Sequence, residues 1–375
     1  MKLNKIKWNL HLIICTLLFM IISIITIYSS QTYLPKYLGN LSMKQLFWYL
    51  VGFLVIITTV KLSHKALYKY SKYLYITGNI LLLLLLFFAT PINNSKCWFI
   101  IPSIGSFQPS EFMKIFLILS VSTSISNYLE KTKKLSFKNE VVIISKVIGL
   151  FLIPGILTFL EPDTGVVLIY FIICVSILFV STIRKRWFII SFSIISIILS
   201  IFLYLYFWKQ SIFVDIFGTD LFYRIDRLLD WKNGTGMQLE NSLTAIGSAG
   251  ILGHGFNKTP IYFPESGTDF IFAVYASNFG LLGCLLLMGI ILYFDIALIR
   301  IALNAKNNTD KFTVIGIISM LVFSQFQNIG MTLGLVPITG ITLPFISYGG
   351  SSLLSYMLVL GILFSIDSES KKTIN

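Results

Sequence analysis

The chain has 375 residues, of which 56% are hydrophobic and 12% are charged, and it contains 32 phenylalanines. This composition excludes an ordinary water-soluble domain, because apolar runs that approach the roughly 20 residues needed to cross a bilayer recur along the sequence. The formal charge of +13 does not indicate a nucleic-acid partner, because the basic residues lie in short segments between the apolar runs, where they orient a membrane protein.

Ten apolar runs predict an all-α polytopic membrane protein with a single transmembrane domain over residues 1–375. The expected helices cover residues 8–29, 44–60, 73–90, 110–128, 141–159, 164–182, 187–208, 269–294, 312–332 and 349–366. The first run is longer than the h-region of a signal peptide, and no small-residue cleavage site follows it. We therefore expect it to stay in the protein as a helix.

The basic residues predict how the helices are oriented. An even number of spans places both termini on one side of the membrane. With the N-terminus in the cytoplasm, 19 of the 29 lysines and arginines fall on the cytoplasmic side and eight fall on the opposite side, although the longest loop, 209–268, lies there. This asymmetry follows the positive-inside rule. We predict a multi-pass protein of the cell membrane with both termini cytoplasmic and a large extracytoplasmic loop at 209–268.

The outer connection before the fourth helix contains Gln108-Pro109-Ser110-Glu111, which has a proline where a helix would begin. Glu111 and Lys114 are three residues apart and would share one helix face. On a soluble protein they would be an ordinary ion pair. Inside a membrane helix both charges are costly, so we expect them to face the bundle interior or a wet cavity and to have a function.

An acidic turn, Glu161-Pro162-Asp163-Thr164-Gly165, joins the fifth and sixth helices on the outer side. A turn followed by a helix cap would explain these residues structurally. A role of Glu161 and Asp163 toward a substrate or a metal ion is the equally weighted alternative.

The 209–268 loop is the only long connection. It contains Arg224, an amphipathic stretch near 238–249 that includes Gln238, and a glycine cluster at 247–255. A loop of this size is typical of a binding element rather than a simple connector. It has no phosphate-binding lysine motif and no dinucleotide fingerprint, so no organic cofactor is expected.

The segment Pro264-Glu265-Ser266-Gly267-Thr268-Asp269-Phe270 closes this loop and opens the eighth helix. Thr268 or Asp269 is a natural N-cap, and a carboxylate in the first turn is stabilised by the helix dipole. Taken alone, a cap is the simpler interpretation of Asp269. The other polar motifs on the same side of the membrane favour a chemical role, with Glu265 and Thr268 beside it.

The last outer connection, residues 337–352, is rich in proline, glycine and hydroxyl groups. Such a backbone needs a protein-lined or wet setting, because polar groups left unpaired in lipid are costly. Its end contains Ser347, Gly349, Gly350 and Ser351. Small residues at a helix start let backbone N–H groups approach an anion, and close helix packing by glycine is the competing interpretation.

The cysteines and histidines form no recognisable site. Cys15, Cys174 and Cys284 lie within apolar runs, Cys97 stands alone in a loop, and the three histidines are scattered. The sequence therefore suggests neither a disulfide nor a thiolate metal cluster.

The outer motifs together resemble one family. The matching pieces are Gln108-Pro109-Ser110-Glu111 with Lys114; Glu161-Pro162-Asp163-Thr164-Gly165; the loop from Arg224 to Gly255; Pro264-Glu265 with Thr268-Asp269-Phe270-Ile271-Phe272; and Pro344-Phe345-Ile346-Ser347-Tyr348-Gly349-Gly350-Ser351-Ser352. In this order they resemble the shape, elongation, division and sporulation family, which includes RodA, FtsW and SpoVE. The resemblance implies ten transmembrane helices and a peptidoglycan glycosyltransferase. Such an enzyme polymerises lipid II at the outer membrane face, beside a class B penicillin-binding protein of the elongation, division or sporulation machinery.

The chain departs from the family pattern at several positions. Gly267 stands where a histidine is common, and Ser277 with Asn278 stands where an acidic pair is common. Cys97 replaces the arginine of an arginine-tryptophan pair, and Trp231 replaces a proline. These departures leave the subgroup open and are compatible with a specialised paralogue.

The reaction that the resemblance implies is attack by the 4-hydroxyl of one lipid-linked disaccharide on the anomeric carbon of another, which expels undecaprenyl pyrophosphate. Asp269 is the expected base. Glu111 and Lys114 would position substrate or balance charge, and Lys114 or a divalent cation, Mg²⁺ or Mn²⁺, would meet the pyrophosphate. No metal ligands can be assigned from the spacing.

Two other functions fit a charged membrane cavity. One is a flippase for a lipid-linked precursor, although the candidate groups cluster at the outer ends of helices and no inverted repeat is apparent. The other is a non-catalytic scaffold for a penicillin-binding protein, which predicts that substitution of Asp269 is tolerated.

Overall fold

The computed structural model describes residues 6–33, 40–91, 95–101, 105–132, 136–181, 183–219, 221–222 and 237–371. Its long helices are α1 (Leu10–Ser30), α2 (Leu41–Leu62), α3 (His64–Phe88), α4 (Pro109–Lys131), α5 (Phe137–Leu160), α6 (Thr164–Val180), α7 (Arg186–Trp208), α11 (Ile271–Leu303), α12 (Asn308–Thr332) and α13 (Gly350–Lys371). Within these ranges nine helices are long and apolar enough to cross a membrane, and α6 is a shorter apolar helix. Each overlaps one predicted helix, so the polytopic all-α fold is confirmed.

Shorter elements lie in the connections. They are the 3-10 helix η2 (Gln31–Tyr33), the helices α8 (Gln210–Phe217) and α10 (Met237–Gly247), and the strands β1 (Phe99–Ile101) and β2 (Gly105–Phe107). The helix α10 confirms the amphipathic stretch expected near 238–249. The antiparallel β1–β2 hairpin was not predicted, because three-residue strands are too short to show an alternating pattern.

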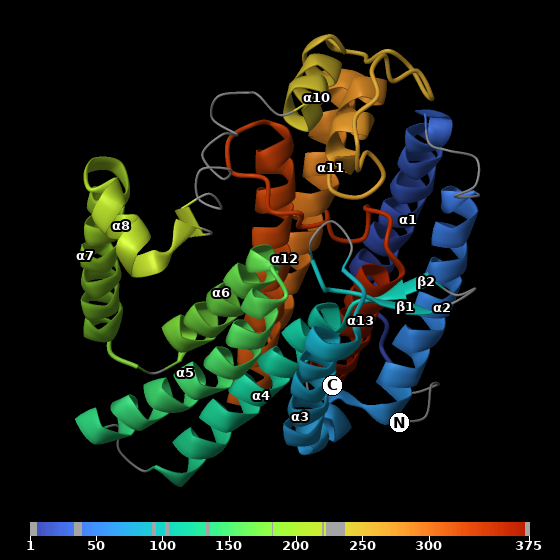
Figure 1. The fold of residues 1–375 in the computed structure, drawn as a ribbon. Helices are drawn as coiled ribbons and strands as arrows, with labels where there is room; N and C mark the ends of the chain where they lie inside the picture. The colour runs from blue at the N-terminus through green and yellow to red at the C-terminus, as the bar shows by residue number, and fades with distance from the viewer. Residues whose placement is uncertain are drawn as a thin grey trace.

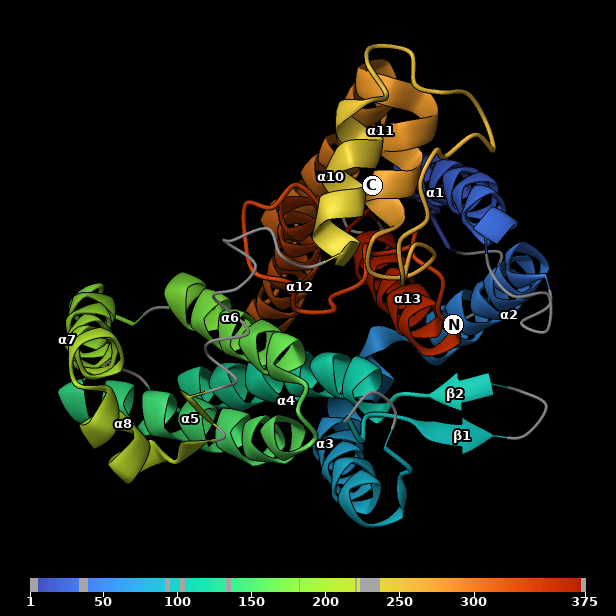
Figure 2. The ribbon, with the colours of Figure 1, turned by 45° about the horizontal axis from the view of Figure 1, so that its top comes forward.

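The helices α4, α12 and α13 form the middle of the bundle, with α1 and α2 at one edge and α7 with α8 at the opposite edge (Figures 1 and 2). The helix α13 packs along α2 through glycines on both helices. A Cβ on Gly361 would lie 2.6 Å from Thr59 Cβ, and one on Gly52 would lie 2.5 Å from Met357 Cγ. These glycines therefore allow the two helices to approach closely, as is typical of membrane bundles.

The helix α7 packs mainly against α8, and the two lie apart from the centre of the bundle (Figure 1). Glu140 of α5 binds the start of α7. Its buried carboxylate accepts hydrogen bonds from Trp187 Nε1 in the first turn of α7 and from Arg184 Nε just before the helix, both at 3.0 Å. Large apolar side chains along α7, such as Phe192, are exposed, as expected for a helix surrounded by lipid.

The two described chain ends lie side by side (Figure 1). The Lys7 backbone N–H donates to Ser368 Oγ at 3.1 Å, and Asn9 Nδ2 donates to Asp367 Oδ2 at 3.2 Å. The ends therefore share one side of the bundle, as the even number of helices predicts. Which side faces the cytoplasm stays a prediction from the basic residues.

The helix α11 differs from the continuous helix 269–294 that the sequence predicts. It begins two residues later, extends to Leu303, and is broken at Gly280, which has φ 61° and ψ −160°. Only glycine adopts such a conformation readily. A turn of the preceding loop fills the break: the Leu281 backbone N–H donates to Gly250 O at 3.1 Å. An apolar run cannot reveal this break, because the partner that stabilises it lies 30 residues away.

Candidate active site

The helix α4 positions the first charged pair. It begins at Pro109, and its first turn carries Glu111 one turn before Lys114. The Lys114 ammonium donates to both carboxylate oxygens of Glu111 at 2.8 Å. Lys114 is 1% exposed and Glu111 is 5% exposed, so the pair is coupled inside the bundle, whereas a wet cavity around it and its function stay predictions.

Two groups of α13 complete the surroundings of this pair. Ser355 Oγ donates to Glu111 Oε2 at 3.3 Å, and the Lys114 ammonium lies 5.4 Å from the centroid of the Tyr356 ring. Lys114 is therefore enclosed and paired, which favours charge positioning over direct contact with a pyrophosphate.

Asp163 in the acidic turn is the N-cap of α6, because its Oδ1 accepts from the Val166 backbone N–H at 3.2 Å. Its second oxygen accepts from Gln108 Nε2 at 3.1 Å, which joins the turn to the start of α4. Burial raises the pKa of Asp163 to about 6, assisted by the charge of Glu111 and opposed by Lys114 and the two hydrogen bonds. Asp163 is thus both a cap and part of the charged site.

Glu161 is enclosed differently. Its side chain is 0% exposed, and within the described ranges neither carboxyl oxygen has a hydrogen-bond partner. Burial, with a smaller effect of the Asp163 charge, raises the pKa of Glu161 to about 9, so the group is neutral at pH 7. The thiol of Cys97 donates to its backbone oxygen at 3.2 Å. In this conformation Glu161 supports the turn and has no surface that a substrate could reach.

The expectation that Thr268 or Asp269 caps α11 is wrong. The N-cap residue is Phe270, and no side chain caps the helix. A tight turn provides hydrogen-bond acceptors for this segment instead. The Phe270 N–H donates to Glu265 O at 3.0 Å, and Thr268 Oγ1 donates to Glu265 Oε2 at 2.7 Å. Because the turn uses Glu265 as its acceptor, the Asp269 carboxylate is not needed to start the helix.

The Asp269 carboxylate is half-buried and faces the 337–343 segment, since a Cβ on Gly340 would lie 3.5 Å from Asp269 Oδ2. Burial raises the pKa of Asp269 to about 7, and the charges of Glu265 and Asp163 add to the shift. A carboxyl with a pKa near 7 is partly ionised at neutral pH and can both accept and return a proton.

Sequence reasoning missed Asn328, a fully buried residue of α12. Its Nδ2 donates to Asp269 O and to Ile341 O, each at 2.8 Å. It thereby holds the Asp269 backbone against the 337–343 segment. The signal that could have identified it is the group of amides Gln325, Gln327 and Asn328 within a membrane helix, where polar side chains are costly without a partner.

The segment leading into α13 bonds directly to two of the acidic motifs, and Gln108 links the third, the 161–165 turn, to them. Ser347 Oγ donates to Thr268 O at 2.6 Å, beside Asp269. Ser351 Oγ accepts from the Gln108 backbone N–H at 3.0 Å, and Ser355, one turn later, bonds Glu111 as described. Residues from four distant parts of the sequence therefore meet at the start of α13.

The glycines at this junction allow close packing. A Cβ on Gly350 would lie 2.7 Å from Trp48 Cε2, and one on Gly165 would lie 2.8 Å from Thr339 O. Gly350 thus fits the packing interpretation of the small residues. Gly349 donates its N–H to Gln45 Oε1 at 3.4 Å.

Glu265 lies at the exposed edge of this cluster, where it accepts from Thr268 Oγ1 and its charge adds to the burial that raises the pKa of Asp269. Gln238 lies in the first turn of α10, where none of the described residues links it by a hydrogen bond to the cluster. Arg224, like Trp231, lies outside the described residues. Among the residues that are described, no group of three His, Cys, Asp or Glu side chains could hold a metal ion, so the residues present do not form a preformed metal centre.

Comparisons with known proteins place these features in context. The profile of the cell cycle protein family of FtsW, RodA and SpoVE matches residues 9–372. Stage V sporulation protein E of Bacillus subtilis is 31% identical over 400 residues, which cover 99% of this chain and 100% of that protein. The Coxiella burnetii protein named "Probable peptidoglycan glycosyltransferase FtsW" is 29% identical over 392 residues, which cover 99% of each chain.

The fold also matches one chain of a solved peptidoglycan synthase complex, described as coordinating polymerization and crosslinking. The TM-score is 0.79, the sequence identity is 23%, and the match covers 96% of this chain and 97% of that chain.

Proposed function

This chain belongs to the FtsW, RodA and SpoVE family of cell cycle proteins, and from that premise we propose that it is a peptidoglycan glycosyltransferase. Its substrate is lipid II, which it polymerises into glycan strands at the outer face of the cytoplasmic membrane. The observation that supports this most is Asp269, a half-buried carboxyl with a pKa raised to about 7 that is not used to cap a helix.

In the proposed reaction the 4-hydroxyl oxygen of the acceptor forms a bond to the anomeric carbon of the donor. The bond between that carbon and the pyrophosphate oxygen breaks, and its electron pair leaves with undecaprenyl pyrophosphate. Asp269 accepts the proton of the attacking hydroxyl. General-base assistance of this kind is most effective when the pKa of the base is near the working pH.

The other charged residues set the electrostatic conditions for Asp269. Burial is the main cause of its raised pKa, and the charges of Glu265 and Asp163 add to it. The Lys114 ammonium offsets part of the negative charge around Asp163. The Gly349 N–H is donated to Gln45 Oε1, whereas the N–H groups of Gly350 and Ser351, at the start of α13, suit the leaving pyrophosphate. A divalent cation, Mg²⁺ or Mn²⁺, remains a separate prediction, and no step is assigned to it.

The proposed partner is a class B penicillin-binding protein, which would crosslink the strands that this chain makes, within elongation, division or sporulation machinery. Support comes from the fold shared with one chain of a peptidoglycan synthase complex. The proposed orientation places Asp269 outside the cell and both termini in the cytoplasm.

The direct test is polymerisation of fluorescently labelled lipid II by the purified protein in nanodiscs, with and without its cognate penicillin-binding protein. We expect glycan strands that require Asp269. A protein that binds lipid II without making strands under either condition would be a scaffold. A protein that moves lipid II across vesicle membranes without extending it would be a flippase.

A further inference from the structure

A turn at residues 250–256 docks into the break of α11. The backbone N–H groups of His254 and Gly255 donate to Ser277 O and Asn278 O at 2.9 and 3.0 Å. In return, the N–H groups of Leu281 and Leu282 donate to Gly250 O and Ile251 O, both at 3.1 Å. The polar backbone that the break exposes is therefore paired, which is the condition for irregular backbone near lipid.

Two glycines allow the backbone of the turn and the backbone of α11 to approach closely. Gly253 has φ 77°, and a Cβ on it would lie 2.3 Å from Asn278 O. Gly280 has φ 61°, and a Cβ on it would lie 2.3 Å from Gly253 N. The turn and the helix therefore form one fixed unit, because neither backbone can move away without breaking the shared hydrogen bonds.

Three contacts place this unit at the outer ends of the spanning helices. Asn278 Nδ2 donates to Ser29 Oγ at 2.6 Å, and Ser29 is in the last turn of α1. Phe256 stacks on Tyr28 of the same turn with 5.8 Å between ring centroids. At the other end of residues 271–279, the Asp269 backbone is held by Asn328, in the outer part of α12.

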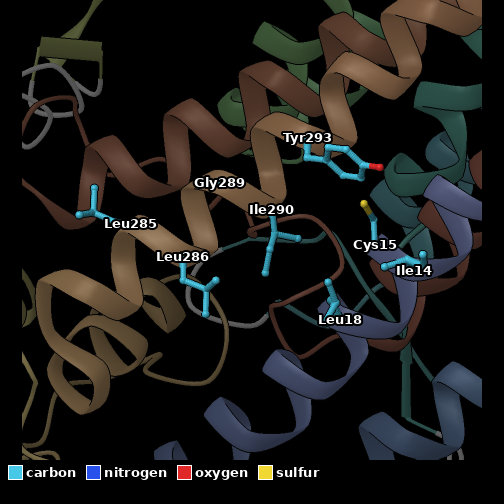
Figure 3. Close-up of a pocket in the computed structure, with 8 residues that line it drawn as sticks. All are labelled: Ile14, Cys15, Leu18, Leu285, Leu286, Gly289, Ile290 and Tyr293. Carbon is cyan, nitrogen blue, oxygen red and sulfur yellow. The ribbon is translucent and has the colours of Figure 1, made fainter.

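The turn presents large apolar side chains at that level. Leu252 is 76% exposed and Ile251 is 63% exposed, next to the exposed Leu281 and Leu282. One turn further along α11, Leu285 and Leu286 line an apolar crevice of about 320 Å³ against α1 (Figure 3). The exposed surface of the turn is thus continuous with the lipid-facing side of a spanning helix.

We propose that residues 250–256 form an outer-leaflet anchor, whose apolar side chains are covered by the acyl chains of membrane lipids. Residues 281–303 then make the membrane crossing of α11. At 1.5 Å per residue this segment is about 35 Å long, which suffices for a hydrocarbon core of roughly 30 Å. Residues 271–279 lie along the outer interface instead and hold Asp269 at the membrane surface.

Site-specific fluorescence tests this placement. The four native cysteines are replaced by serine, single cysteines are introduced as Leu252→Cys, Leu285→Cys and Glu240→Cys, and each is labelled with an NBD fluorophore. Leu285 is the matched lipid-facing control, and Glu240 on α10 is the matched exposed polar control. The proteins are reconstituted into phosphatidylcholine nanodiscs that contain lipids with a doxyl quencher at carbon 5 or carbon 12.

We expect the probe at position 252 to be quenched by both lipids, more strongly from carbon 5, and to be protected from aqueous iodide. The probe at position 240 should be quenched by aqueous iodide and by neither doxyl lipid. Equal iodide quenching of the probes at 252 and 240 would overturn the proposal. Protection of the probe at 252 from iodide and from both doxyl lipids would also overturn it, because protein would then cover the turn. If labelling at 252 lowers the melting temperature, Ile251→Cys and Phe256→Cys provide the same test.

Discussion

At Asp269 the local fold and the proposed chemistry use different atoms. In the turn before α11, Phe270 and Thr268 donate their hydrogen bonds to Glu265, and Asn328 donates only to the backbone oxygen of Asp269. The carboxylate can therefore change its protonation state without loosening the helix start. A residue that only capped the helix would not have this freedom.

Asp269→Asn should separate these roles, because it keeps the shape of the side chain and removes the proton acceptor. We expect lipid II polymerisation to fall by about 10²- to 10⁴-fold, with membrane expression, melting temperature and lipid II binding nearly unchanged. Asp215→Asn, at an exposed position of α8, is the matched control and should retain activity. Full polymerisation by Asp269→Asn would remove this residue from the mechanism and favour a flippase or a scaffold.

The pH profile gives an independent test, because a general base acts in its ionised form. With a pKa of about 7 for Asp269, kcat/KM should rise roughly tenfold per pH unit below pH 7 and level off above it. Glu265→Gln removes a charge that raises this pKa, so the rising limb should move to lower pH. Glu240→Gln, exposed on α10, should leave the limb in place; an unmoved limb in Glu265→Gln would contradict the assignment.

At the scale of elements, the Glu111–Lys114 pair of α4 is buried against Ser355 and Tyr356 of α13. Removing one partner leaves the other charge buried and unpaired, which costs about 3–5 kcal/mol. We expect Glu111→Gln and Lys114→Met to be strongly destabilised, and the double variant to be more stable than the sum of the two effects predicts. Thermal unfolding of all four proteins in nanodiscs measures the coupling. Additive effects would mean that the two charges act independently.

The break in α11 makes a second prediction at this scale. Gly280→Ala places a Cβ against the Gly253 backbone at a positive φ, so we expect a clear loss of melting temperature. Gly289→Ala, in the second half of α11, meets no atom within 4 Å and should be neutral or stabilising by about 0.5–1 kcal/mol. Similar melting temperatures for the two variants would show that the break is not required.

At the scale of the whole molecule, the start of α13 connects regions that the membrane topology places on one side. The acidic turn, the start of α4 and the segment before α11 all lie at the same end of the bundle as residues 347–355. A reversed orientation would put the complete site in the cytoplasm, so the topology decides where polymerisation takes place.

Cysteine labelling decides the orientation. In a cysteine-free background, a cysteine near Asn233, or Lys258→Cys in the described part of the same loop, should react with an impermeant maleimide on intact spheroplasts. Lys185→Cys, exposed before α7, should react only after permeabilisation. The opposite pattern would invalidate the topology and every site assignment that depends on it.

The functional motifs could be recognised before the fold was known, but their geometry could not. Spacing alone predicted that Glu111 and Lys114 share a helix face, because residues three apart are neighbours on any helix. It could not predict that Glu161 is sealed from solvent whereas Asp163, two residues later, bonds Gln108. That difference depends on neighbours that are remote in sequence.

The sequence by itself determined the membrane class, the ten long helices and which polar residues share one side. It also gave the approximate bounds of these helices, except for the start of α3, which lies nine residues earlier than predicted, and the course of α11. Hydrophobic runs and the lysine and arginine distribution are local properties, so no tertiary information is needed to read them. Only the tertiary structure decided that Asp269 does not cap α11, that α11 breaks at Gly280, and that Ser347 and Ser351 bring the acidic motifs together. The first outcome is set by a tight local turn on Glu265, and the other two by hydrogen bonds between atoms tens to hundreds of residues apart. Neither kind of contact leaves a periodic trace along the chain.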